Sequence, residues 1–147
     1  MKLSTRVQYG TRALLDLALH GGEELVLLRD IAQRQQISLL YLAHLITPLV
    51  AAGIMSSTRG ARGGVRLVKP TQKIKLSEVV QLLDGSTALV GCVDDSETCS
   101  RSDLCVTRDI WGELKQAIDG VLESTTLHDL VERQKKKEKS AEVMYYI

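Results

Sequence analysis

Residues 28–68 read LRDIAQRQQISLLYLAHLITPLVAAGIMSSTRGARGGVRLV, and they are the most informative residues about the fold. Apolar residues recur at helical spacing over residues 28–35 and again over residues 39–52, which predicts two helices joined by a short polar turn. Ser38 is a residue type that caps the N-terminus of a helix, and Gly53 is a typical stop. The stretch therefore begins as a helix-turn-helix.

A hairpin is predicted directly after the second helix. Two short runs of β-type residues, 54–58 and 65–68, flank the glycine-rich segment RGARGG. Upstream, residues 3–20 show helical spacing of apolar side chains, with Ser4 as the expected N-cap. Three helices followed by a basic hairpin is the order of a winged helix-turn-helix domain. The sequence thus predicts a mainly α fold with a small β-hairpin.

The charge of the chain is divided unevenly along its length. Residues 1–75 contain eleven Lys or Arg against four Asp or Glu, a net charge of +7. Residues 76–147 contain eight against fourteen, a net charge of −6. A basic first half suits a polyanion such as DNA, and an uneven surface without function is the simpler alternative. Together with the predicted winged helix, the asymmetry favours DNA binding.

The helix over residues 39–52 is expected to enter the major groove by its first turns. Its expected DNA-binding residues are Ser38, Leu39, Tyr41 and His44. The hairpin turn is expected at the minor groove, because arginine suits a narrow groove and glycine allows close approach of the backbone. Its expected DNA-binding residues are Arg59, Gly60, Arg62 and Gly64. A nucleotide-binding P-loop fits less well, since RGARGG lacks the Gly-Lys-Ser or Gly-Lys-Thr ending and precedes no helix.

All three cysteines, Cys92, Cys99 and Cys105, lie within one polar, acidic segment. Because the surrounding residues are polar or charged types that usually stay in contact with solvent, these thiols are not expected to fill a core. Three thiolates supply three of the four ligands that zinc or an iron–sulfur cluster takes, and the lack of closely paired cysteines ranks zinc below a cluster. A redox-active thiol switch and inert cysteines are the alternatives.

Further helices are expected on both sides of the cysteines. Ser77 is the expected N-cap of a short helix over residues 78–83, and a longer amphipathic helix is expected over residues 109–124. The apolar side of this long helix is larger than a lone helix can hide, which predicts a dimer interface. Its expected dimerisation residues are Ile110, Leu114, Ile118 and Val121. A last short helix, capped by Thr126, is expected over residues 127–134.

These elements predict four parts of the chain. They are a winged helix-turn-helix domain over 1–84, a cysteine loop over 85–107, a dimerisation helix with a short C-terminal helix over 108–134, and a tail over 135–147. No apolar run reaches membrane-spanning length and no signal-peptide pattern is present, so we expect a cytoplasmic protein without a membrane partner. No set of nucleophile, base and orienting residue is recognisable, so an enzyme is not expected.

Several stretches together resemble one known family. They are KLSTRVQYGTRALLDLAL at residues 2–19, LRDIAQRQQISLLYLAHLITPLVAAGIMSSTRGARGGVRL at residues 28–67, LSEVVQLLDG at residues 76–85, and the three spaced cysteines. This combination, which spans about residues 2–134, resembles the Rrf2-type transcriptional regulators, most closely the iron–sulfur cluster regulators of the IscR type.

The resemblance implies a homodimer built on the long helix, a two-fold operator on double-stranded DNA, and an iron–sulfur cluster held by the three cysteines, with [2Fe-2S] favoured over [4Fe-4S]. In IscR-like members a histidine three positions after the last cysteine completes the site, and Arg108 stands there in this chain. Relatives that sense nitric oxide or redox state use a carboxylate where this chain has Gln8. The fourth ligand is therefore expected to be an oxygen donor or an external ligand.

Three functions follow from these expectations. The leading one is a DNA-binding regulator, a repressor of genes for cluster assembly, that senses iron–sulfur clusters. The second is a nitric oxide or thiol redox-sensing regulator of the same type. The more remote third is an iron–sulfur electron carrier, which would need the cluster but not the basic first half. Salt-dependent binding to a palindromic duplex separates the two regulators from the carrier.

Overall fold

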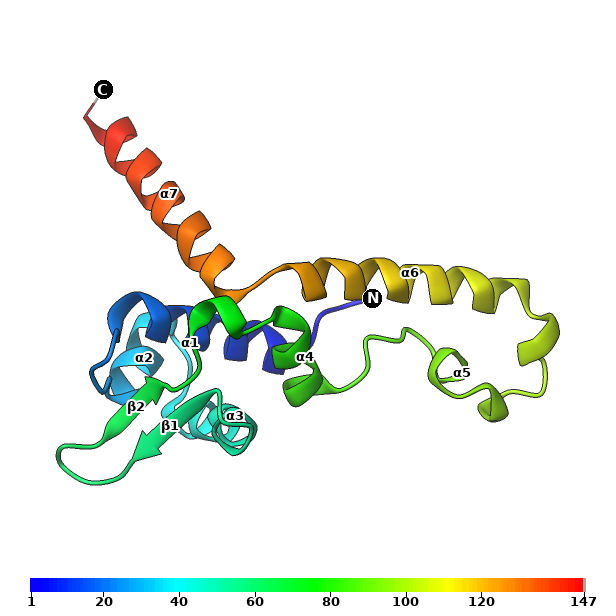
Figure 1. Ribbon diagram of the computed structural model, residues 1–147, viewed down its shortest axis with the longest axis horizontal. Helices are drawn as coiled ribbons and strands as arrows, with labels where there is room; N and C mark the ends of the chain where they lie inside the picture. The colour runs from blue at the N-terminus through cyan, green and yellow to red at the C-terminus, as the bar shows by residue number, and fades with distance from the viewer. Residues whose placement is uncertain (147) are drawn as a thin grey trace.

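The computed structural model describes residues 1–146, and Ile147, the last residue of the expected tail, lies outside the described part. The chain folds into helices and one two-stranded antiparallel sheet (Figure 1). The elements are, in chain order, α1 Thr5–His20, α2 Leu28–Gln35, α3 Leu39–Ala51, β1 Met55–Thr58, β2 Gly64–Leu67, η1 Thr71–Lys73, α4 Leu76–Asp84, α5 Gly91–Asp94, η2 Ser96–Thr98, η3 Ser102–Leu104, α6 Val106–Ser124 and α7 Leu127–Tyr145. The predicted mainly α fold with a small hairpin is confirmed.

Three helices begin where their capping residues predicted. The side chains of Ser4, Ser38 and Thr126 each accept a hydrogen bond from a main-chain N–H in the first turn of α1, α3 and α7. Each bond satisfies one of the N–H groups that the start of a helix leaves without a partner. α3 also continues through Pro48 to Ala51, and the N–H of Ala52 donates to the Pro48 carbonyl across 3.1 Å.

The expected cap of the fourth helix is wrong. α4 begins at Leu76, one residue before Ser77, because the Leu76 N–H donates to the carbonyl of Thr125 across 2.9 Å. Ser77 lies inside the helix, and its hydroxyl donates instead to the carboxylate of Glu123 across 2.6 Å. A contact with the connection between α6 and α7 therefore decides where this helix starts.

The C-terminal helix is also longer than expected. α7 does not end at Gln134 but continues to Tyr145, so the lysine-rich run 135–139 is helical rather than a loose end. Only the first turns of α7 are buried, at Leu127 and Val131. Beyond them, Gln134 donates to Glu138 across 3.0 Å, a pair one turn apart that stabilises a helix with little tertiary support.

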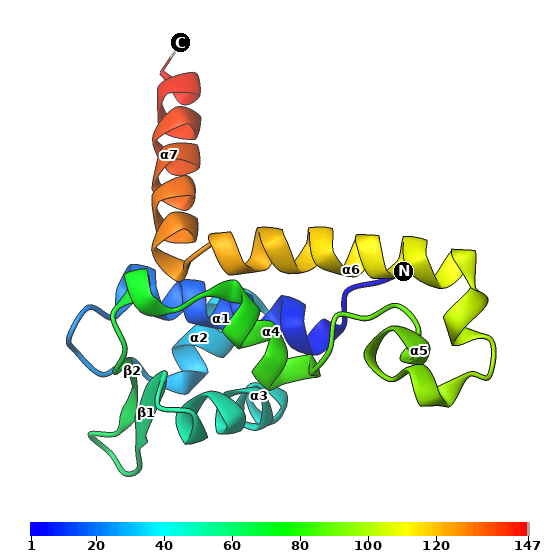
Figure 2. The same cartoon turned by 45° about the vertical axis from the view of Figure 1, so that its right-hand side comes forward.

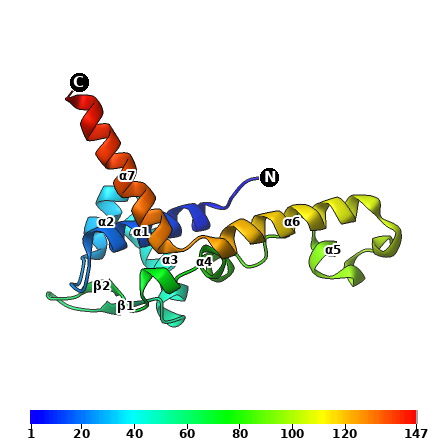
Figure 3. The same ribbon diagram turned by 45° about the horizontal axis from the view of Figure 1, so that its top comes forward.

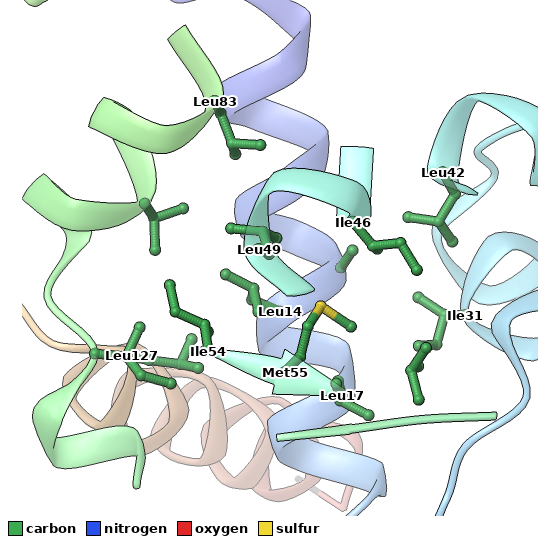
Figure 4. Packing of buried hydrophobic residues seen from close by; sticks show 14 of the residues in the cluster. Leu14, Leu17, Ile31, Leu42, Ile46, Leu49, Ile54, Met55, Leu83 and Leu127 are labelled. Atoms are coloured by element: carbon green, nitrogen blue, oxygen red, sulfur yellow. The ribbon is translucent and has the colours of Figure 1, made fainter. Parts of the chain in front are cut away.

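The core surrounds α1 (Figure 4). Buried side chains from α1, α2, α3, α4 and α7 and from the hairpin form one cluster, and several are at most 2 % exposed: Leu14, Leu17, Leu49, Ile54 and Leu127. Burial of each such leucine contributes about 1.5–3 kcal/mol. α1 and α4 approach so closely that a Cβ at Gly10 would lie 2.4 Å from Leu83 Cδ1.

α6 and α7 leave this core in different directions. α6 begins at the far end of the molecule, where α5 lies beside it, and ends at the core (Figure 1). α7 stands away from α6 in the turned views as well (Figures 2 and 3). None of the described residues of α6 is buried. Among residues 1–146, no helix is both long and apolar enough to cross a membrane.

Candidate functional site

The first turns of α3 carry an exposed outer side. Leu39 and Leu40 are 50 % and 73 % exposed, and His44 is exposed one turn further on. The Oγ atom of Ser38 accepts from the Tyr41 N–H across 3.1 Å, so its own hydroxyl hydrogen stays available for an acceptor such as a phosphate. These side chains are arranged as a recognition helix requires, with the start of the helix facing outward.

Tyr41 is positioned by contacts with α1. Its ring meets that of Tyr9 edge to face, with centroids 6.1 Å apart and planes at 84°. Its hydroxyl lies 3.4 Å from Thr5 Oγ1. Tyr41 is therefore half-buried and joins α3 to α1, a role that its position in the sequence does not indicate.

Thr47 belongs to the same outer side of α3 and was missed by the sequence analysis. It is exposed and lies three residues after His44, at the spacing that places two side chains on one side of a helix. Its Oγ1 donates to the carbonyl of Ala43 across 3.0 Å. The spacing of residues 40, 44 and 47 is the signal that could have identified it.

The hairpin presents its arginines at the turn. β1 and β2 pair from Met55 with Leu67 to Thr58 with Gly64. Arg59 and Arg62 are exposed in the connecting turn, and Gly60 there has a φ of 103°, which favours glycine. The hairpin and α3 lie on the same side of the molecule in Figures 1 and 2, away from the end of α7.

Gly64 has a structural contact in addition to its expected DNA-binding role. A Cβ at this position would lie 2.7 Å from the carbonyl oxygen of Val26. Beside it, Val26 and Val65 exchange two main-chain hydrogen bonds of 2.9 and 2.8 Å. A side chain at Gly64 would therefore force the hairpin away from the segment before α2.

The cysteine lobe, residues 85–107, is built of short helical turns rather than open loop. Cys92 lies on α5, Cys99 follows η2, and Cys105 is the residue directly before α6. Ser102 is buried within the lobe, and its hydroxyl lies 2.8 Å from the carbonyls of both Ser96 and Cys99. This hydroxyl holds the turn around Cys99.

The cysteines have suitable chemistry for a metal cluster but do not form a finished site. All three are free thiols, with Cys99 exposed and the other two half-buried. Within residues 1–146, no three Cys, His, Asp or Glu side chains gather closely enough to hold a metal ion. The three thiols are thus the right ligand type for a cluster. In this conformation, however, they do not lie close enough together to hold one.

Arg108 and Cys105 define the junction between the lobe and α6. Arg108 Nε donates to the main-chain carbonyl of Cys92 across 2.8 Å, so this side chain is engaged in holding α5. Cys105 Sγ lies 3.2 Å from Thr107 Oγ1. Hydrogen bonds from the Thr107 hydroxyl and then from the Arg108 main chain lower the pKa of Cys105, which favours a thiolate at this helix N-terminus.

The expected dimerisation residues share one exposed side of α6. Ile110, Leu114, Ile118 and Val121 are 47 %, 36 %, 38 % and 65 % exposed. A largely apolar groove of about 420 Å³ adjoins them, and its lining includes Leu3, Leu89, Leu114, Ile118 and Leu122. An apolar strip of this size on a helix without buried residues is typical of an interaction surface.

Comparisons with known proteins agree with this arrangement. The sequence model of the Rrf2 family, described as "Iron-dependent Transcriptional regulator", matches residues 3–133. The protein rrf2 of Nitratidesulfovibrio vulgaris is 47 % identical over 131 residues, which cover 89 % of this chain and 87 % of that protein.

Two solved structures share both fold and sequence with this chain. The structure of T. potens IscR is 36 % identical, with a TM-score of 0.77, and the match covers 93 % of this chain and 90 % of that one. The structure of CymR, the global cysteine regulator of B. subtilis, is 33 % identical, with a TM-score of 0.74 over 90 % of this chain and 98 % of that one. This chain belongs to the Rrf2 family of transcriptional regulators and is similar to IscR.

Proposed function

We propose that this protein is a sequence-specific DNA-binding repressor of genes for iron–sulfur cluster assembly, which senses iron–sulfur clusters through its cysteine lobe. We place it in the cytoplasm, without a membrane partner. One observation carries the proposal: Cys105 directly precedes α6, the helix whose apolar side is exposed. Because the lobe is continuous with this helix, a conformational change at the thiols would shift α6. Such a shift would alter subunit assembly and the DNA-binding domain of residues 1–84.

The proposed DNA interface combines α3 with the hairpin turn. Its residues are Ser38, Leu39, Tyr41, His44, Arg59, Gly60, Arg62 and Gly64. The exposed start of α3 supports contacts with base edges in the major groove, and the exposed arginines of the turn support contacts in an adjacent minor groove. The proposed target is double-stranded DNA with a two-fold operator.

We also propose that α6 forms a two-fold homodimer. The four apolar side chains on its exposed side, Ile110, Leu114, Ile118 and Val121, would pack against the same strip of a second copy. A symmetric dimer presents two copies of α3, so its half-sites should be separated by a whole number of DNA helical turns.

The proposed cofactor is an iron–sulfur cluster on Cys92, Cys99 and Cys105, with [2Fe-2S] favoured over [4Fe-4S]. Three free thiols in one lobe and the similarity to IscR support it. The lobe would have to rearrange to bring the thiols together. Arg108 has no electron pair to offer a metal, so the fourth ligand should be an oxygen donor or an external ligand.

A thiol redox regulator is the second candidate, and specific observations favour it. The three cysteines are free and do not gather into one group, and the lowered pKa of Cys105 favours its thiolate. The similar CymR structure is named as that of a cysteine regulator. In this alternative the same lobe would signal through oxidation of its thiols.

Visible absorption together with iron and sulfide content of the anaerobically isolated protein tests the proposal. Cluster sensing predicts a visible absorption band in the wild-type protein. Replacement of Cys92, Cys99 or Cys105 by serine should abolish this band and should also change which operators the protein prefers. Ser100→Ala, an exposed change in the same lobe, should keep the band. A wild-type protein without iron whose DNA binding changes on thiol oxidation would instead establish the second candidate.

A further inference from the structure

One side of α1 contacts both helices of the helix-turn-helix unit. Thr5 and Tyr9 contact Tyr41 of α3, as described above. One and two turns further along, Arg12 and Asp16 contact the end of α2. The side chains recur every three or four residues, so they form a continuous polar row along the helix.

Asp16 is the most buried member of this row, at 1 % exposed. Its Oδ1 accepts from Arg34 Nη2 across 2.6 Å, and its two oxygens lie 3.1 and 3.0 Å from Arg34 Nε. Its Oδ2 also accepts from Gln35 Nε2 across 2.8 Å. Burial alone would raise the pKa of Asp16, but these hydrogen bonds, with the charges of Arg34 and His20, hold it below its usual value. The carboxylate is therefore a charged anchor.

Gln35 is held from both ends by α1. Its amide donates to Asp16, while its side-chain oxygen accepts from Arg12 Nε across 3.2 Å and its main-chain carbonyl accepts from Arg12 Nη2 across 2.6 Å. Gln35 is the last residue of α2, and its main-chain carbonyl is one of those that a helix end leaves without a partner.

The turn that follows Gln35 determines where α3 begins. Gln36 has a φ of 55° and a ψ of 46°, a left-handed conformation that is unfavourable for a residue with a side chain unless the surroundings fix it. Two residues later Ser38 caps α3. The contacts from Arg12 and Asp16 therefore fix the backbone immediately before the start of the recognition helix.

We propose that Asp16, acting through Gln35, is a positioning residue for DNA sequence recognition. It sets the direction in which α3 enters the major groove without touching DNA. Base-edge hydrogen bonds depend on fine placement of α3, whereas contacts with phosphates are available on every DNA sequence and therefore contribute equally to the binding of any duplex. Loss of the anchor should thus reduce discrimination between sequences more than overall affinity for DNA. The inference rests on the DNA-binding role proposed above.

The test compares two duplexes and three variants. One duplex is enriched from a randomised library by the wild-type protein, and the other is a shuffled duplex of equal length. The variants are Asp16→Asn, Gln35→Met and the control Glu78→Gln. Glu78 is also the acidic partner of an ion pair, with Lys69 across 2.8 Å, but it lies on α4. Affinity for each duplex, the salt dependence of binding and the melting temperature are measured for all four proteins.

Asp16→Asn and Gln35→Met should weaken binding to the enriched duplex by about tenfold, the effect of a mismatched base pair, with unchanged salt dependence. Binding to the shuffled duplex should change by less than about twofold, as should both affinities of Glu78→Gln. The inference would be overturned if folded Gln35→Met kept the wild-type ratio of affinities for the enriched and shuffled duplexes, whether both affinities were unchanged or both fell equally. That variant decides the question even where Asp16→Asn does not fold, because it keeps the pair of Asp16 with Arg34. If the wild-type protein enriches no duplex, the DNA-binding role itself fails.

Discussion

Arg108 Nε donates a hydrogen bond to the main-chain carbonyl of Cys92 across 2.8 Å, which ties the first turn of α6 to α5. Arg108 stands at the position where the resemblance to IscR-like regulators places a histidine ligand. A guanidinium cannot ligate iron, but here it holds the backbone of the first cysteine. In this chain the residue at this position therefore holds the backbone of α5 and does not ligate a metal.

Arg108→His should supply an imidazole at the edge of the cysteine lobe. If the three cysteines hold a cluster, its decay in air should become slower than in the wild-type protein, because a protein ligand replaces an exchangeable one. The visible absorption of protein reconstituted with iron and sulfide measures the decay. Arg108→Ala is the control, since it removes the tie to Cys92 without adding a ligand. Equal decay in the two variants would argue against this position as a ligand site.

Replacement of Leu114 and Ile118 by glutamate should give a monomer that no longer binds its operator tightly. Charges within the apolar strip of α6 would have to lose their water on association, which opposes dimerisation. Sedimentation and DNA titration measure the two effects. Gln116→Glu adds a charge on the opposite side of α6 and should leave the dimer intact. A wild-type protein that is monomeric at micromolar concentration would contradict the proposed dimer.

Arg59→Ala should weaken operator binding by about 1–3 kcal/mol, because the hairpin turn is proposed to place this guanidinium in a minor groove. Its exposed position in the turn means that the fold should be unaffected. Affinity titration at fixed salt is the measurement. Arg133→Ala removes an exposed arginine from α7, a helix outside the proposed DNA interface, and should bind as the wild-type protein does. Unchanged affinity in Arg59→Ala would mean that the turn does not contact DNA.

Asp16→Asn should destabilise the protein by about 1–2 kcal/mol at neutral pH, because the buried acceptor of the Arg34 hydrogen bonds loses its charge, while water screens the partly exposed guanidinium that remains. The pKa of Asp16 is lower in the folded protein than its ordinary 3.8, so its stabilisation is fully present above that value. It is lost as the pH falls through the lower folded pKa. Melting temperatures measured from neutral to strongly acid pH should therefore fall more steeply for the wild-type protein than for Asp16→Asn. Parallel curves would show that folding does not lower the pKa of Asp16.

Elements that depend on local interactions could be predicted from the sequence. Ser4, Ser38 and Thr126 bond N–H groups within the next few residues, and the bounds of α2 were predicted as observed. The positions of His44 on the outer side of α3 and of Arg59 and Arg62 in the hairpin turn also followed from periodicity and turn composition. Such features depend on spacing along the chain, which a sequence displays directly.

Features that depend on partners distant in the sequence could not be predicted before the fold was known. Ser77 failed as a cap because Thr125 and Glu123, residues beyond the cysteine lobe, determine the start of α4 and the bond of the Ser77 hydroxyl. Asp16 became a buried anchor only when the packing of α2 on α1 brought Arg34 to it. The cysteines were identified as possible ligands from composition, but composition could not show that their side chains do not gather into one group in this conformation. Caps and periodicity reflect interactions within one or two turns, whereas these contacts exist only once distant segments have been folded together.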